Sequence, residues 1–222
     1  MRKNVVTGLF LQFVVWALIL YGWGFDDLIG FFARPARTVL LIGAVLATVI
    51  VSVACPDFDP FRKGEKPVGS QRWMLGFLAV VTLFSAWFMP YADRRGLLVF
   101  RESDSIRYVG LALNVIGGTL RLAGFLALGR QFSGYVTVQQ NHQLVQTGVY
   151  RVIRHPMYLG VLLAFPGAAL VFRSWVVFPM FLVFAVLLGV RVQQEEKLLA
   201  EHFGAESEAY RRRTWRLIPF VY

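Results

Sequence analysis

Long apolar runs separated by short polar stretches dominate the pattern along this chain. A helix that crosses a bilayer needs about 20 predominantly apolar residues. Four runs meet that length: Val5–Phe25, Thr38–Cys55, Trp73–Ala92 and Tyr108–Gly129. The first follows two basic residues, as a signal peptide would, but it is long and no cleavage site follows, so we expect a retained helix.

The last apolar run, Met157–Val190, is too long for one helix and is interrupted by Arg173 and Ser174. This pattern predicts two helices joined by a tight turn at Phe172–Trp175. The first of them, Met157–Val171, is short for a full crossing of the bilayer. The predicted fold is therefore all-α: a polytopic membrane bundle of about six hydrophobic helices, the last two forming a hairpin.

The composition supports a membrane protein, and it changes how the net positive charge is interpreted. Hydrophobic residues make up 57% of the 222 residues and charged residues 16%, against about 25% charged in soluble domains. The net charge of +10 suggests nucleic acid at first. However, the arginines lie in short loops and beside apolar runs, where the positive-inside rule places them. We therefore expect no nucleic-acid partner, and we expect both termini and the segment 148–160 to face the cytoplasm.

The chain is expected to form a single membrane domain, with N-terminal transmembrane helices in 1–107 and a catalytic core in 108–222. Arg121 lies inside an apolar run, where a charge costs about 3 kcal/mol. We expect its side chain to face the bundle interior or a wet cavity, unless it reaches out to the membrane surface. The single cysteine, Cys55, allows no disulfide within the chain and no thiolate metal site.

Two polar regions, 130–156 and 191–215, flank the predicted hairpin. Because a hairpin leaves and returns to one surface, its entry and exit should be neighbours. The sequence therefore predicts one polar site that contains Arg154, His155, Tyr158, Arg191, Glu195 and Glu196. The simpler alternative is a solvated charge cluster with one ion pair worth under about 1 kcal/mol.

Local chemistry refines this site. Pro156 suits the first turn of a helix, whose unpaired N–H groups attract an anion. Arg191 and Glu195 are four residues apart and can share a helix face, whereas Glu196 points about 140° away from Arg191. His142 and His155 lack the spacing of a metal site, and glycine-rich nucleotide motifs are absent, so we expect no metal.

Two segments carry a family resemblance: LGRQFSGYVTVQQNHQLVQTGVYRVIRHPMYLG and RVQQEEKLLAEHFGAESEAYRRRTWRLIPFVY. Together they resemble the isoprenylcysteine carboxyl methyltransferase family, which is similar to the membrane phospholipid N-methyltransferases. The ordered set of GxY, RHPxYxG, an apolar hairpin, EExxL, FG and a terminal RxIP carries the resemblance. The family often has GEEY near the end; here AESEAY stands instead, and Tyr210 takes the place of that tyrosine.

The resemblance implies a cytoplasm-facing S-adenosylmethionine pocket, formed by the loop before the hairpin and a C-terminal helix. The implied cofactor contacts are Gln139, His142, Leu144, Gly148, Tyr150, His155, Pro156, Tyr158, Leu159, Gly160, Glu195 and Glu196. The implied reaction-centre residues are Arg154, Arg191 and Glu196.

These residue types suit methyl transfer. Glu195 or Glu196 could bind the cofactor's amino group. For a carboxylate acceptor, the guanidinium of Arg154 or Arg191 could orient the acid. An amine or thiol acceptor would instead need a base, and Glu196 is the nearest candidate. The expected partners are the lipid bilayer and a lipophilic or prenylated substrate, most like a prenylcysteine carboxylate; N- or S-methylation remains open.

Two other functions compete with this interpretation. An NADPH-dependent membrane reductase of the steroid-reductase type is similar near its C-terminus. There we would expect an asparagine before the tyrosine and an acid after the glycine, where Met157 and Val161 stand. A small channel or assembly factor is the other alternative, but Arg121 is the only strong intramembrane charge, so no ion pathway is visible.

Overall fold

The computed structural model describes residues 2–54, 71–133 and 143–221, and its only regular elements there are helices. Cys55 lies outside these residues. The α-helices are α1 (Arg2–Trp23), α2 (Leu28–Phe32), α3 (Pro35–Ala54), α4 (Gln71–Arg95), α5 (Asp104–Leu128), α6 (Pro156–Val171), α7 (Val177–Phe203) and α8 (Ala205–Arg212). Three short 3-10 helices are η1 (Phe25–Asp27), η2 (Gly129–Gln131) and η3 (Gly148–Arg151).

Within the described ranges, four helices are long and apolar enough to cross a membrane: α3, α4, α5 and α7. A fifth span is possible from α1 and α2, whose segments Phe10–Trp23 and Phe25–Phe32 meet at 76°. The bend lies at Gly24, whose φ of 106° is in the region that favours glycine. Many large apolar side chains on these helices are exposed, as lipid-facing surfaces require. The predicted polytopic membrane bundle is confirmed.

The predicted final hairpin is also confirmed. Helix α6 spans 16 residues and is shorter than the helices that qualify as spans. It ends at Val171, and the chain turns through Arg173, whose φ is 54°, before α7 begins. The turn is fixed by the α4–α5 loop, because the N–H of Phe100 donates to the carbonyl of Arg173 (2.8 Å). Helix α7 continues without a break through the polar segment to Phe203, so its last turns can carry site residues.

A seam of glycines joins α5 to α6. Gly110, Gly117 and Gly124 on α5 are seven residues apart, and Gly160 and Gly167 on α6 have the same spacing. A Cβ atom on Gly117 would lie 2.4 Å from the carbonyl oxygen of Gly160, and one on Gly110 would lie 2.6 Å from that of Gly167. The two backbones therefore approach as closely as small residues allow, which is typical of membrane helices.

A buried ion-pair network ties the bundle together at the end that carries α2. The carboxylate of Asp93 accepts from Arg37 (3.2 Å), Arg107 (2.9 Å) and Arg173 (2.7 Å), which come from α3, α5 and the hairpin turn. Glu102 also binds Arg107 at 3.0 Å. Since the Asp93 side chain is only 1% exposed, the network cross-links four segments away from solvent.

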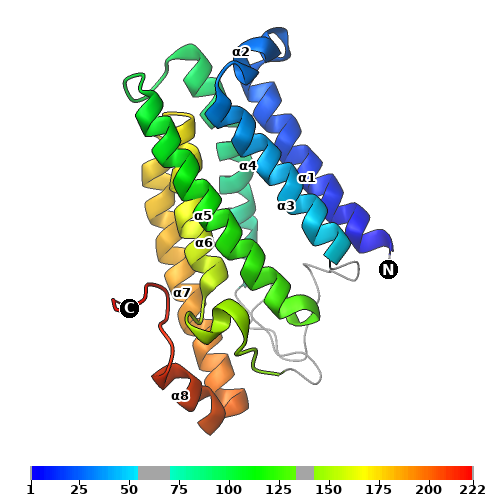
Figure 1. The fold of residues 1–222 in the computed structure, drawn as a ribbon, viewed down its shortest axis with the longest axis vertical. Coiled ribbons are helices and arrows are strands. Elements are labelled where there is room, and N and C mark those ends of the chain that lie inside the picture. The colour runs from blue at the N-terminus through cyan, green and yellow to red at the C-terminus, as the bar shows by residue number, and fades with distance from the viewer. Residues whose placement is uncertain (1, 55–70, 134–142, 222) are drawn as a thin grey trace.

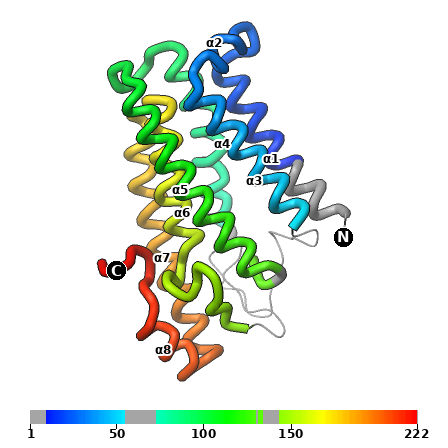
Figure 2. Tube along the Cα trace, viewed as in Figure 1, coloured from blue at the N-terminus to red at the C-terminus, as the bar shows by residue number. Residues whose placement is uncertain are grey.

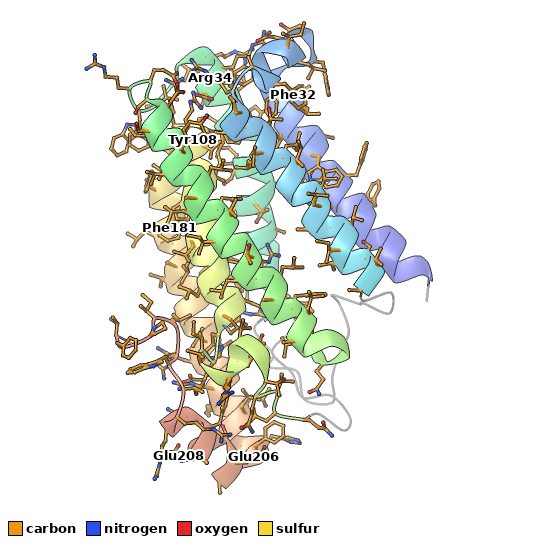
Figure 3. All side chains as sticks on the ribbon, in the orientation of Figure 1. Phe32, Arg34, Tyr108, Phe181, Glu206 and Glu208 are labelled. Atoms are coloured by element: carbon orange, nitrogen blue, oxygen red, sulfur yellow. The ribbon has the colours of Figure 1, made fainter. Side chains whose placement is uncertain are left out.

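The helices form two groups (Figure 1). Helices α5, α6 and α7 run side by side, whereas α1 and α3 diverge from α6 and α7 towards the end that carries η3 and α8, as the trace in Figure 2 also shows. Charged side chains mark both ends of the bundle, with Arg34 labelled at one end and Glu206 and Glu208 at the other (Figure 3). The polar segments predicted to form the site lie at the α8 end.

Candidate active site

The site is built where the chain enters α6. Gly148 begins η3 with a φ of 59°, which favours glycine, and the chain then passes through Tyr150 into the helix start. Pro156 occupies the first turn of α6 and is fully buried, as its missing N–H allows. His155 stands at the N-cap without a side-chain cap bond, so its ring is available for other contacts.

A C-terminal segment is paired with this entry. The N–H of Arg154 donates to the carbonyl of Trp215 (2.8 Å), and the N–H of Trp215 donates to the carbonyl of Val152 (2.9 Å). The N–H of His155 donates to the carbonyl of Arg216 at 3.2 Å. These bonds form a short parallel bridge and hold residues 214–216 against the site.

Glu196 is the centre of a cluster of cationic or ionisable partners, the most distant of which is Arg211 at 4.0 Å. Its carboxylate accepts from Arg154 Nε (3.1 Å) and Arg216 Nη2 (2.6 Å), and His155 Nε2 lies 3.3 Å from Oε1. Arg154 also donates to the carbonyls of Arg211 and Thr214. The Glu196 side chain is 7% exposed, so its charge is stabilised by these partners rather than by water. We call Arg154, His155, Glu196 and Arg216 the Glu196 cluster.

A second arrangement links α6 to α7 through one tyrosine. Arg191 Nε donates to the Tyr158 hydroxyl at 2.8 Å, and that hydroxyl donates to Glu195 Oε2 at 2.7 Å. The His155 ring stacks on the Tyr158 ring with centroids 5.6 Å apart. Tyr158 is therefore fixed from three sides, and the Glu195 side chain, 34% exposed, remains accessible although its Oε1 lies 4.0 Å from His155 Nδ1.

Tyr210 of α8 lines the site at the α8 end of the bundle. Its hydroxyl donates to the carbonyl of Tyr150 at 2.7 Å, and both side chains are buried. Burial raises the pKa of Tyr210 to about 12, so the phenol is neutral and keeps its donor proton near neutral pH. The contact explains how α8 is held beneath η3.

These elements surround a cavity of about 510 Å³ with two different walls. The polar wall includes Tyr150, Arg154, His155, Tyr158, Arg191, Glu195 and Tyr210, with Gln131, Ser133 and Gln143 at its edge. The apolar wall comes from α1, α4, α6 and α7, and includes Leu11, Val15, Leu75, Leu78, Leu83, Val161, Phe184 and Leu188. Arg121 of α5 also lines the cavity, which confirms that it faces a cavity within the bundle.

The predicted convergence of the two hairpin ends is confirmed, because residues about 40 positions apart form the contacts above. Of the predicted cofactor contacts, the cavity wall contains Leu144, Tyr150, His155, Tyr158 and Glu195. The described wall does not contain Gly148, Pro156, Leu159, Gly160 or Glu196. Gln139 and His142 lie outside the described residues.

The geometry gives some of these residues other contacts. Gly160 packs against α5, where a Cβ would lie 2.5 Å from the Gly117 carbonyl oxygen. Among the predicted reaction-centre residues, Arg154 and Glu196 bind each other and the C-terminal segment, whereas Arg191 binds Tyr158. Glu195, rather than Glu196, is the carboxylate on the cavity wall.

Sequence reasoning missed two parts of the site. The contribution of α1 and α4 to the wall had no signal, because a cavity-facing leucine and a lipid-facing leucine look alike in sequence. The pairing of Trp215 and Arg216 with the α6 entry was also missed, although the terminal RxIP motif marked that segment.

Comparison with known proteins gives a consistent result. Residues 106–206 match the phospholipid methyltransferase family. A probable protein-S-isoprenylcysteine O-methyltransferase of Oryza sativa is 32% identical over 126 residues, which are 54% of this chain and 65% of that protein. The protein-S-isoprenylcysteine O-methyltransferase of Saccharomyces cerevisiae is 33% identical over 120 residues, 51% of this chain and 48% of its own length.

A third relative is an uncharacterized protein of Bacillus subtilis, 29% identical over 125 residues and matched over 73% of its length. The chain spans less than two thirds of the length of the first two relatives. The family match over residues 106–206 contains the hairpin and the polar wall except Tyr210. The resemblance seen in the sequence motifs is confirmed.

Proposed function

We propose that this chain, whose residues 106–206 match the phospholipid methyltransferase family, is an integral membrane S-adenosylmethionine-dependent methyltransferase that acts on a lipophilic acceptor. One observation carries the proposal: a single cavity joins a polar wall containing the accessible carboxylate of Glu195 to an apolar wall between the spans. A charged cofactor and an apolar acceptor can meet in such a place.

The residues present fit the cofactor. A volume of about 510 Å³ is within the usual range for small-molecule sites. Glu195 is accessible and could accept from the cofactor's amino group in a charge-assisted hydrogen bond. Leu144, Leu198 and Tyr150 give the same wall apolar and aromatic surface for an adenine ring. The proposed cofactor contacts are Leu144, Tyr150, His155, Tyr158 and Glu195. Gln139 and His142, which lie outside the described residues, are also proposed contacts.

The protein's contribution to the reaction is alignment and exclusion of water. When bound, S-adenosylmethionine supplies a methyl group on a positively charged sulfur. Tyr158, held between Arg191 and Glu195, keeps the polar wall rigid, as an in-line displacement requires. A carboxylate acceptor loses no proton, so no base is needed. We propose that Arg154 and Glu196 are positioning residues, which hold His155 and the C-terminal segment in place.

The acceptor proposed here is a prenylcysteine-type carboxylate. The rice and yeast relatives are named for isoprenylcysteine O-methylation, and the apolar wall of this cavity suits a prenyl chain. Phospholipid amines and small thiols are the alternative acceptors.

We propose that the site faces the cytoplasm. At the α2 end, Arg34, Arg37, Arg94, Arg107 and Arg173 are ion-paired with acids. Arg95 and Arg101 at that end are exposed, as are Arg151, Arg212 and Arg213 at the α8 end, where Arg212 pairs with Glu208. Lysines and arginines are more numerous in the segments predicted to be cytoplasmic than in the segments at the α2 end, and this bias supports the positive-inside orientation.

Binding and transfer assays on detergent-purified protein test the function. We expect it to bind S-adenosylhomocysteine and not NADPH, and to transfer a labelled methyl group to S-farnesylcysteine. Micromolar NADPH binding without S-adenosylhomocysteine binding would favour the reductase interpretation. Transfer to phosphatidylethanolamine but not to S-farnesylcysteine would keep the methyltransferase and replace the acceptor.

A further inference from the structure

Arg121 is a charged residue on the cavity wall to which the proposed reaction assigns no role. It lies on α5 between Gly117 and Gly124, inside a candidate span, and its side chain is exposed on the cavity. No hydrogen bond or ion pair joins it to another described residue. The two other arginines on the described wall are engaged: Arg154 with Glu196, and Arg191 with Tyr158.

The height of Arg121 in the cavity is set by the glycine seam. A Cβ on Gly160 would lie 3.0 Å from the Cβ of Arg121, so Arg121 stands level with the second turn of α6. Tyr158 of the polar wall lies just before that level, and Val161 of the apolar wall lies just after it. Arg121 therefore marks the junction of the two walls, where the polar end of an apolar acceptor would be placed.

A charge inside a candidate membrane span needs a partner. Ionised groups inside a membrane span normally pair with an opposite charge or mark a functional site. Described acids within the cavity are limited to Glu195, which binds Tyr158. A ligand with its own negative charge would supply the missing partner.

We propose that Arg121 binds the anionic group of the acceptor and thereby selects acids among lipophilic acceptors; this inference rests on the proposed methyltransferase function. The guanidinium can bind a carboxylate through two parallel hydrogen bonds. A neutral acceptor of the same shape, such as a carboxamide, offers it no opposite charge. Arg121 is in this sense a specificity-determining residue, which favours an acid over a neutral acceptor of the same shape.

Equilibrium binding tests the proposal without relying on turnover. The probes are radiolabelled S-farnesylcysteine and its carboxamide, which differ in charge but hardly in shape. We expect the wild-type protein to bind the acid at least about tenfold more tightly than the amide, as one charged hydrogen-bonded pair allows. Arg121→Gln should abolish this preference, leaving the affinity for the amide and for S-adenosylhomocysteine unchanged. Arg121→Lys should retain part of the preference.

Arg151→Gln is the matched control, since Arg151 is an exposed arginine at the same end that does not line the described cavity. It should keep the full preference for the acid. Retained S-adenosylhomocysteine binding shows that the Arg121→Gln protein is folded, and the wild-type comparison of acid with amide needs no variant.

Three results would overturn the proposal. They are equal wild-type affinity for acid and amide, a preference that persists in Arg121→Gln, and loss of S-adenosylhomocysteine affinity in that variant at an unchanged melting temperature, which would assign Arg121 to the cofactor. If the methyltransferase proposal is wrong, the wild-type protein will not bind S-adenosylhomocysteine. A preference for the acid that depends on Arg121 would still support the anion site in that case.

Discussion

Glu195 and Glu196 are consecutive carboxylates with different surroundings. The Glu195 side chain is 34% exposed and lies on the cavity wall, whereas the Glu196 side chain is 7% exposed within the Glu196 cluster. One step along α7 rotates the side chain by about 100°, which is enough to separate the two environments. The pair therefore offers two substitutions of the same chemistry with different expected results.

Glu195→Gln should weaken the binding of S-adenosylhomocysteine by about tenfold, because a neutral amide replaces the charged partner of the amino group. The melting temperature should change by no more than about 2 °C, since the side chain is partly exposed. Isothermal titration calorimetry in detergent measures the affinity. An unchanged affinity would remove Glu195 from the cofactor site.

Glu196→Gln should mainly destabilise the protein. It leaves Arg154 and Arg216 beside a neutral group in a buried place, and loss of one partner of a buried pair typically costs about 3–5 kcal/mol. We expect a clear fall in the melting temperature, measured by intrinsic fluorescence. Glu201→Gln, at an exposed position of the same helix, is the control. A normal melting temperature with lost cofactor binding would instead make Glu196 a direct ligand.

Gly117→Ala should disrupt the seam between α5 and α6. Its Cβ would lie 2.4 Å from a backbone carbonyl oxygen, so the helices must separate, at a cost of about 1–3 kcal/mol. Gly118→Ala is the matched control, because nothing lies within 4 Å of its Cβ position. It should leave stability unchanged or raise it, as alanine favours helix. Equal melting temperatures for the two variants would show that the seam is not tightly packed.

Glu102→Gln tests the ion-pair network at the α2 end through its pH dependence. The hydrogen bond from Arg107 lowers the pKa of Glu102 below its ordinary value. A lowered pKa in the folded protein stabilises it above the ordinary value, and this stabilisation is lost as the pH falls through the folded value. The melting temperature of Glu102→Gln should therefore be lower than that of the wild type at pH 7.

The difference in melting temperature between Glu102→Gln and the wild type should shrink below about pH 4.3, where glutamate ordinarily titrates. Arg34 and Arg173 also face Glu102, so the stabilisation belongs to the group and not to one pair. A difference that stays constant from pH 7 to pH 3.5 would contradict the expected titration.

Much of this architecture could be predicted because apolar run length is a strong signal in membranes. The break at Arg173 and Ser174 divided the last run correctly, and the hairpin geometry then required residues about 40 positions apart to meet. Helical periodicity also predicted that Glu196 would point away from Arg191, as it does.

Other features depend on three-dimensional packing that one sequence does not specify. The bend at Gly24 places α2 across the end of the bundle, and nothing in the apolar run of α1 marks it strongly. The partners of Glu196 include Arg216, which belongs to a segment without helical or strand periodicity. The glycine spacing of seven in α5 and α6 was visible, and it is the signal that could have predicted their contact.

The ion-pair network around Asp93 has a consequence for motion. It fastens α3, α4, α5 and the hairpin turn at one end, while α1 and α3 splay away from α6 and α7 at the other (Figure 2). Widening of the bundle at the α8 end would require α3 and α5 to pivot about the Asp93 network, because their other ends are held there. We therefore expect a bulky acceptor to enter through a pivoting movement of whole helices about Asp93.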